Sequence, residues 1–187
     1  MSAHVIGGVK HMAKRKVKIN RAPVLTLWAT IVAERLGYDH DAALTLGKAV
    51  AGLNAQSKGR RLGLFDEAKH PADQGESKAP RPDEQVMITL LGRPVPAVRT
   101  AQGVRATVKG KPIDPSSVRR YLELKFGEDL DEVQSALEVL ASAYQGERLT
   151  TLAYALYEKF RPQVSEGEKG WGVKGELNLD YIRSLAE

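Results

Sequence analysis

The residues in this sequence that are best suited to chemistry are two groups of basic side chains. The first 33 positions contain no acid but several lysines and arginines, and a shorter basic group follows further along. Clustered cations attract nucleic-acid backbones by releasing counterions from phosphates, without reading bases. A solvated charge cluster that binds nothing is the alternative interpretation. The candidate binding residues are Lys14, Arg15, Lys16, Lys18, Arg21, Lys58, Arg60 and Arg61.

The segment between the two basic groups is predicted to form a pair of helices. Asn20 can cap the first helix, and Pro23 suits its first turn because the missing N–H has no partner there anyway. Apolar residues at helical spacing cover much of this helix, which predicts that it is buried. Gly37 is placed to end it in a left-handed conformation.

Small residues dominate the second helix of the pair. Asp39 or Asp41 can cap it, and we expect it to end near Asn54. Gly47 and Gly52 each weaken a helix by about 1 kcal/mol relative to alanine. Their presence predicts close backbone contact with another helix or with a ligand.

The segment from Val32 to Leu46 resembles a helix-turn-helix motif. Ala33 and Gly37 stand where that motif needs small residues, and the resemblance implies a second helix that enters the major groove. Asp39 and Asp41 would then face phosphates, whereas arginine, lysine, asparagine or glutamine is typical of base-reading positions. A helical pair that serves as plain core is the competing interpretation.

Composition changes sharply between residues 66 and 83, where three prolines and mixed charges occur without a large apolar residue. Such a stretch is typical of a flexible linker. We therefore expect a basic flexible arm at 1–19, an N-terminal helical pair at 20–64, a linker at 65–83, and a small β element with a C-terminal helical part at 84–187.

The second half of the chain begins with a predicted β element. Residues 84–91 suggest a strand, and a hairpin turn is expected around Gly103. Pro94 and Pro96 argue against a central strand at their positions, so we expect a small sheet with exposed edges. Val17 and Ile19, which alternate with lysines, could form one further short strand.

The last third is predicted to be helical. Asp114 opens a helix that Gly127 closes, and Asp129 with Glu132 matches a capping box. Apolar residues then continue on both sides of Gly146, which is expected to end the first of two antiparallel helices. A short final helix follows a glycine-rich loop, with Asn178 as its cap.

Catalytic and ligand-binding signals are thin. The histidines lack metal-ligand spacing, and no nucleophile elbow or metalloprotease motif occurs. The segment GEKGWGVKG, residues 167–175, could cradle a phosphate, but it lacks the phosphate-loop pattern, and Trp171 is better explained as a hydrophobic plug. We expect no catalytic residue, metal or cofactor, and lean against an enzyme.

The sequence as a whole predicts a mainly α protein of the α+β class. A net charge of +5, the absence of cysteine and the lack of a membrane-length apolar run favour a cytoplasmic protein without a membrane partner. The favoured function is binding of DNA or RNA through the phosphate backbone, as a regulator or nucleoid accessory protein. A homo-oligomeric or protein–protein interaction module without nucleic-acid binding is the alternative.

Overall fold

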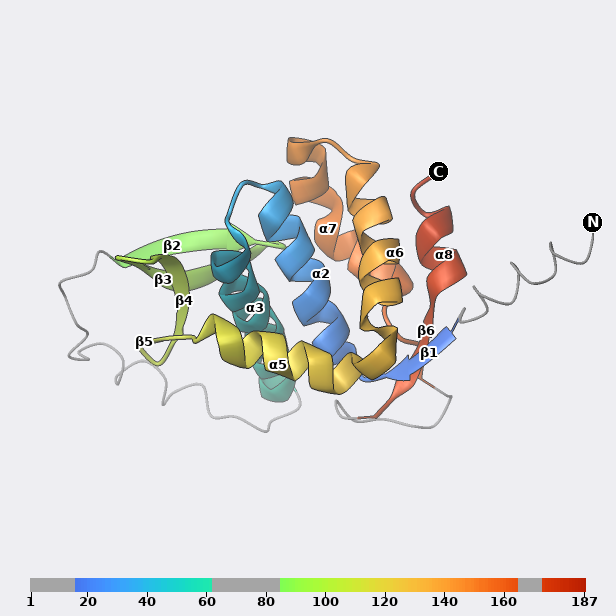
Figure 1. The fold of residues 1–187 in the computed structure, drawn as a ribbon, viewed down its shortest axis with the longest axis horizontal. Coiled ribbons are helices and arrows are strands. Elements are labelled where there is room, and N and C mark those ends of the chain that lie inside the picture. Colours follow the sequence, from blue (N-terminus) through green and yellow to red (C-terminus); the bar gives the residue numbers. More distant parts are fainter. Residues whose placement is uncertain (1–15, 62–84, 165–172) are drawn as a thin grey trace, which may run out of the picture.

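The computed structural model of the chain describes residues 16–61, 85–164 and 173–187, with the backbone alone at 56–61. It shows a mixed α+β fold, with helices in both halves and a small antiparallel sheet at one side (Figure 1). The elements are β1 (Lys16–Ile19), α2 (Arg21–Arg35), α3 (His40–Arg61), β2 (Gln85–Leu90), β3 (Arg93–Thr100), β4 (Gly103–Val108), β5 (Lys111–Pro112), α5 (Pro115–Phe126), the 3-10 helix η2 (Gly127–Asp129), α6 (Leu130–Ser142), α7 (Gly146–Phe160), β6 (Gly175–Asn178) and α8 (Leu179–Ser184).

Helix α2 lies at the centre of the structure. Every residue from position 23 to 33 is buried, because α3 covers one side of the helix and α5, α6 and α7 cover the rest (Figure 1). Trp28 is fully buried, packs edge-on against Phe160, and donates from Nε1 to the carbonyl of Ala153 at 3.0 Å. The predicted burial of the first helix is confirmed, and the same core includes side chains from both halves of the chain.

The predicted ends of α2 are partly confirmed. Gly37 has φ +109°, and its N–H and that of Tyr38 donate back to the carbonyls of Glu34 and Ala33, which is the Schellman arrangement. Asn20 occupies the N-cap position, but its side chain makes no capping hydrogen bond. The prediction for the C-terminal end of α2 is therefore confirmed, whereas the predicted capping bond at its N-terminal end does not form.

Gly47 explains how closely α2 and α3 approach. A Cβ atom at this position would lie 2.3 Å from Thr30 Oγ1 and 2.6 Å from the carbonyl oxygen of Thr26. The predicted close contact is thus confirmed at Gly47, with α2 as the neighbour. Gly52 is exposed, and no described atom lies within 4 Å of a Cβ built there, so no described helix makes the predicted contact at that position.

The four-stranded sheet has the order β2-β3-β4-β5 and consists of hairpins. Residues 91–92 connect β2 to β3 and residues 101–102 connect β3 to β4, as the predicted turn at Gly103 requires. Pro94 and Pro96 lie in the part of β3 that pairs with β2 alone, because pairing of β3 with β4 begins only at Ala97. The prediction that no central strand occurs at their positions is therefore confirmed, although β3 as a whole lies between β2 and β4.

The C-terminal helices follow the predicted order with two differences. Asp114 caps α5 by accepting a hydrogen bond from the N–H of Ser116 at 3.0 Å, as expected. The predicted capping box at Asp129 is wrong, because η2 precedes α6 and gives this residue a helical backbone without a side-chain cap bond. Gly146 begins α7 instead of ending α6, and both helices pack on α2.

The second sheet was missed in part by sequence reasoning. The suggested strand at Val17 and Ile19 exists as β1, but its partner β6 lies between the expected loop and the expected final helix, where no strand was predicted. The two strands pair antiparallel from Lys16 with Asn178 to Ile19 with Gly175. Asn178 then caps α8 as predicted. Among the described helices, none combines the length and apolar character needed to cross a membrane.

Replacing Gly47 by alanine should destabilise the fold, whereas Gly52→Ala should not. The added methyl group at position 47 meets the backbone of α2, and overpacking of this kind costs about 1–3 kcal/mol. At position 52 the same change only improves helix propensity, by up to about 1 kcal/mol. Urea unfolding of the two variants measures the difference, and equal midpoints would contradict the close packing.

Candidate nucleic-acid interface

The eight predicted binding residues fall into three groups in the structure. Lys14 and Arg15 lie outside the described residues, as does most of the predicted arm. Lys16 and Lys18 belong to β1, and Arg21 is the first residue of α2. The other three, Lys58, Arg60 and Arg61, belong to the last two turns of α3, where only the backbone is described.

Pairing of β1 with β6 fixes the direction of the two strand lysines. Val17 and Ile19 are buried in the core, so Lys16 and Lys18 project from the opposite, exposed face. Glu176 lies opposite Lys18, and its carboxylate is 3.9 Å from the ammonium of Lys16. Both side chains of this ion pair are about half exposed, so it adds little stability, and Glu176 offsets one of the two lysine charges.

The antiparallel packing of α2 and α3 brings the two predicted basic groups to one end of the helix pair. Gly47 lies level with Thr26 and Thr30, so the start of α2 lies level with the part of α3 near Asn54. The sequence predicted that α3 ends near this residue, which is wrong, because the helix continues to Arg61. Those seven further residues extend α3 by about 10 Å beyond the start of α2.

A pair of arginines adds charge at this end. Arg21 donates from Nε to the carbonyl of Pro162 at 2.9 Å, which brings it beside Arg161. Burial lowers the pKa of Arg21, and the positive charge of Arg161 lowers it further. Neither guanidinium forms an ion pair with a carboxylate among the described residues.

We call this part of the molecule the basic end. It comprises Lys16, Lys18, Arg21, Arg161 and the last two turns of α3. Arg161 was missed by sequence reasoning because it follows α7 and meets Arg21 only through tertiary packing. Arg161 and Arg21 are 140 positions apart in the sequence, so the pattern of charge along the chain does not indicate that they are neighbours in space.

The structure contradicts the helix-turn-helix interpretation of Val32 to Leu46. Residues 42–47 and 49–51, which form the first turns of α3, are buried by α2, the sheet and α5. A recognition helix needs an exposed face that can enter the major groove. The small residues of this helix instead serve internal packing, as the competing interpretation proposed.

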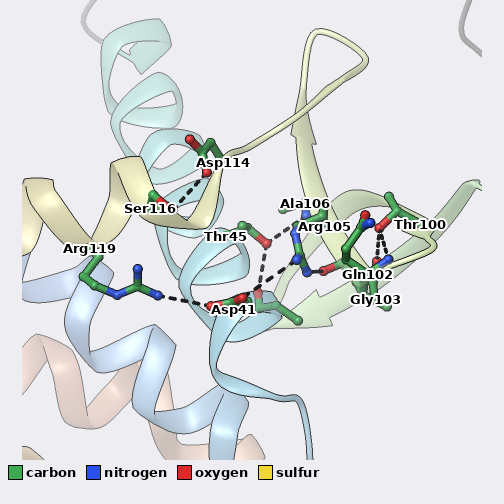
Figure 2. Close-up of polar contacts among 12 residues, drawn as sticks. Asp41, Thr45, Thr100, Gln102, Gly103, Arg105, Ala106, Asp114, Ser116 and Arg119 are labelled. Carbon is green, nitrogen blue, oxygen red and sulfur yellow. Dashed lines mark hydrogen bonds and ion pairs between the residues drawn. The ribbon is translucent and has the colours of Figure 1, made fainter.

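Ion pairs within the fold explain why Asp41 stands at the start of α3. Figure 2 shows Arg119 of α5 on one side of it, at 3.1 Å, and Arg105 of β4 on the other, at 3.9 Å. One turn along, Thr45 Oγ1 accepts a hydrogen bond from the buried N–H of Ala106 at 2.9 Å. These contacts connect α3, α5 and β4, and they hold the sheet against the helices.

Sites for other chemistry receive no support from the described residues. His40, between two aspartates in sequence, is hydrogen-bonded through Nδ1 to Glu34. No group of three or more potential metal ligands occurs in the described part of the chain. Two cavities, of about 380 and 70 Å³, lie near Glu34, at the far end of α2 from Arg21. Residues 167–172 of the glycine-rich loop lie outside the described residues, and so does the linker at 65–83.

Comparisons with known proteins add no family to this picture. No protein-family model, no curated protein and no solved structure matches the chain. Inference about function therefore depends on the geometry of the chain itself.

Thr45→Val should weaken the attachment of the sheet to α3. The change preserves the shape of the side chain but leaves the buried N–H of Ala106 without an acceptor, which costs about 1–3 kcal/mol. Thr45→Ser keeps the hydroxyl and serves as the control. Hydrogen exchange at the Ala106 amide should accelerate in the valine variant only, and equal protection in both would contradict the assigned bond.

Alkaline stability should depend on Tyr157. Burial raises the pKa of its phenol above the ordinary value near 10, and its hydroxyl lies 3.5 Å from the carbonyl oxygen of Arg21. The folded state therefore holds this proton more tightly than the unfolded state, so stability is retained below pH 10 and lost as the pH rises further. Tyr157→Phe should flatten that loss in unfolding experiments. It should also remove the step at highest pH when the ionisation of the tyrosines is followed by absorbance.

Proposed function

We propose that the chain binds the phosphate backbone of DNA or RNA at its basic end. The carrying observation is the antiparallel arrangement of α2 and α3, which directs two basic segments far apart in sequence to one end of the helix pair. The strand lysines project outward there, and the Arg21–Arg161 pair lacks a described carboxylate partner. Each of these features favours a polyanion over a neutral or cationic partner.

The expected mode of recognition is contact with phosphates, without base reading. The buried first turns of α3 cannot present side chains to base edges, and the exposed basic residues are lysines and arginines spread over several elements. Binding of this kind is sequence-tolerant and strongly salt-dependent. A regulator that relied on this surface would need a further source of specificity. Sequence-tolerant binding therefore fits an accessory protein better than a regulator.

Neutralising the strand lysines should weaken nucleic-acid binding. In the variant Lys16→Gln/Lys18→Gln, two phosphate contacts are removed, so the slope of log affinity against log salt should become shallower by about 1.8 for duplex DNA. Affinity at low salt should fall at least tenfold. Fluorescence anisotropy with labelled duplex DNA, duplex RNA and single strands measures both quantities and compares the ligands.

The matched control is Lys109→Gln/Lys111→Gln. These exposed lysines lie at the turn between β4 and β5, away from β1, and the change in net charge is identical (Figure 1). Arg161→Gln provides a second variant at the basic end, where loss of like-charge repulsion should leave the melting temperature unchanged or higher while binding falls. Equal losses in the control, or salt-independent binding, would rule out the proposal.

The alternative of an oligomeric module loses part of its motive. Gly47 was one reason to expect an interface between copies, but atoms of α2 in the same chain fill the space beside it. The apolar surface of α2 is likewise buried inside the fold. An interface between copies would have to use another surface.

A further inference from the structure

The two edges of the four-stranded sheet are built very differently. At one edge, β5 is only two residues long and consists of Lys111 and Pro112. At the other, β2 is six residues long, without a charge or a proline, and its pairing with β3 is continuous from Gln85 to Leu90. Proteins normally protect sheet edges with short strands, lysine, proline or bulges. By these criteria β5 is protected and β2 is open.

The prolines of β3 reveal which backbone groups of β2 face outward. Pro94 and Pro96 lie opposite Thr89 and Met87, and proline has no N–H to donate. These are therefore the non-hydrogen-bonded pairs of the ladder, which alternate with hydrogen-bonded ones. The carbonyl of Pro96 indeed turns away from β2, because it accepts a hydrogen bond from Thr107 of β4 at 3.3 Å.

The alternation directs the N–H and C=O groups of Gln85, Met87 and Thr89 to the outer edge of β2. No strand of the described chain pairs with that edge. The side chains of the same three residues are exposed on the face of the sheet that α3 does not cover, and Met87 is 63% exposed. An extended segment could therefore add to this edge through three residues whose outward backbone groups pair with no described strand.

We propose that this edge pairs with the same edge of a second copy of the chain. A two-fold axis at Met87 places Met87 opposite its counterpart and Gln85 opposite Thr89, so that all three outward residues of both copies form hydrogen-bonded pairs. A shift of the axis to Ile88 would leave one of the three unpaired. Since β2 has no charged residue, pairing with a second copy brings no like charges together, and it covers the exposed Met87. The edge is therefore self-complementary.

A single strand pair is a small interface, so the dimer should dissociate on dilution. Sedimentation of the full chain over a range of concentrations should show a monomer–dimer equilibrium without nucleic acid. Met87→Lys places two ammonium groups face to face and should raise the dissociation constant at least tenfold. Val108→Lys, which makes the same change at the exposed valine near the other edge, should leave the constant unchanged.

The absence of cysteine allows a direct test of register. Opposed residues of an antiparallel pair have Cα atoms about 5.5 Å apart, within the range of a disulfide. Met87→Cys should therefore form a covalent dimer on mild oxidation, whereas Val108→Cys should not. Gln85→Cys alone should also fail, because its copies lie about 14 Å apart, but mixed with Thr89→Cys it should cross-link.

Three outcomes would overturn the proposal. The chain could remain monomeric at millimolar concentration, as it would if its own residues covered β2. Met87→Lys and Val108→Lys could weaken a dimer equally, which would place the interface elsewhere. Cross-linking could be as rapid at position 108 as at 87, which would exclude the stated register. None of these results depends on nucleic-acid binding, so this proposal and the proposed function can fail separately.

Discussion

The fold depends on backbone contact between α2 and α3 at Gly47. The glycine allows the helices to approach so closely that the hydroxyl of Thr30 and the carbonyl of Thr26 occupy the space of a side chain. Both threonines turn their hydroxyl groups to carbonyls one turn earlier in α2, so the contact buries no unsatisfied donor. Because α3 covers this side of α2 so tightly, the sheet can pack on α3 while α6 and α7 close the opposite side.

The same contact sets the distribution of charge along the molecule. An antiparallel pair must place the first residue of one helix beside a late residue of the other, whatever their separation in sequence. Acidic Asp39 and Asp41 consequently lie at the turn end, where Asp41 holds Arg119 and Arg105. The residues of the basic end lie at the open end of the pair, with β1. Their gathering results from packing, and it could not be inferred from net charge alone.

Sequence reasoning succeeded where a signal is local and failed where partners are distant. Gly37, Asp114 and Asn178 act through atoms within a few residues, so their roles as helix ends were predictable. Strand β6 escaped notice because four residues with one large apolar side chain carry no pattern, and only β1 gives them an extended partner. The prolines of β3 were a reliable local signal, since the strand has a paired neighbour on only one side at their positions.

The basic residues at the end of α3 can be explained by the helix dipole, and those of β1 cannot. Cations in the last turns of a helix, like aspartates in its first turn, offset the helix dipole, and Arg161 stands in the same relation to α7. Their presence is thus compatible with a protein that binds no polyanion. Lys16 and Lys18 lie in a strand, where no helix dipole calls for a cation, and Lys16 forms an exposed ion pair with Glu176 of β6. Exposed ion pairs contribute little stability, so the charges of the strand lysines are the ones that a binding function would best explain.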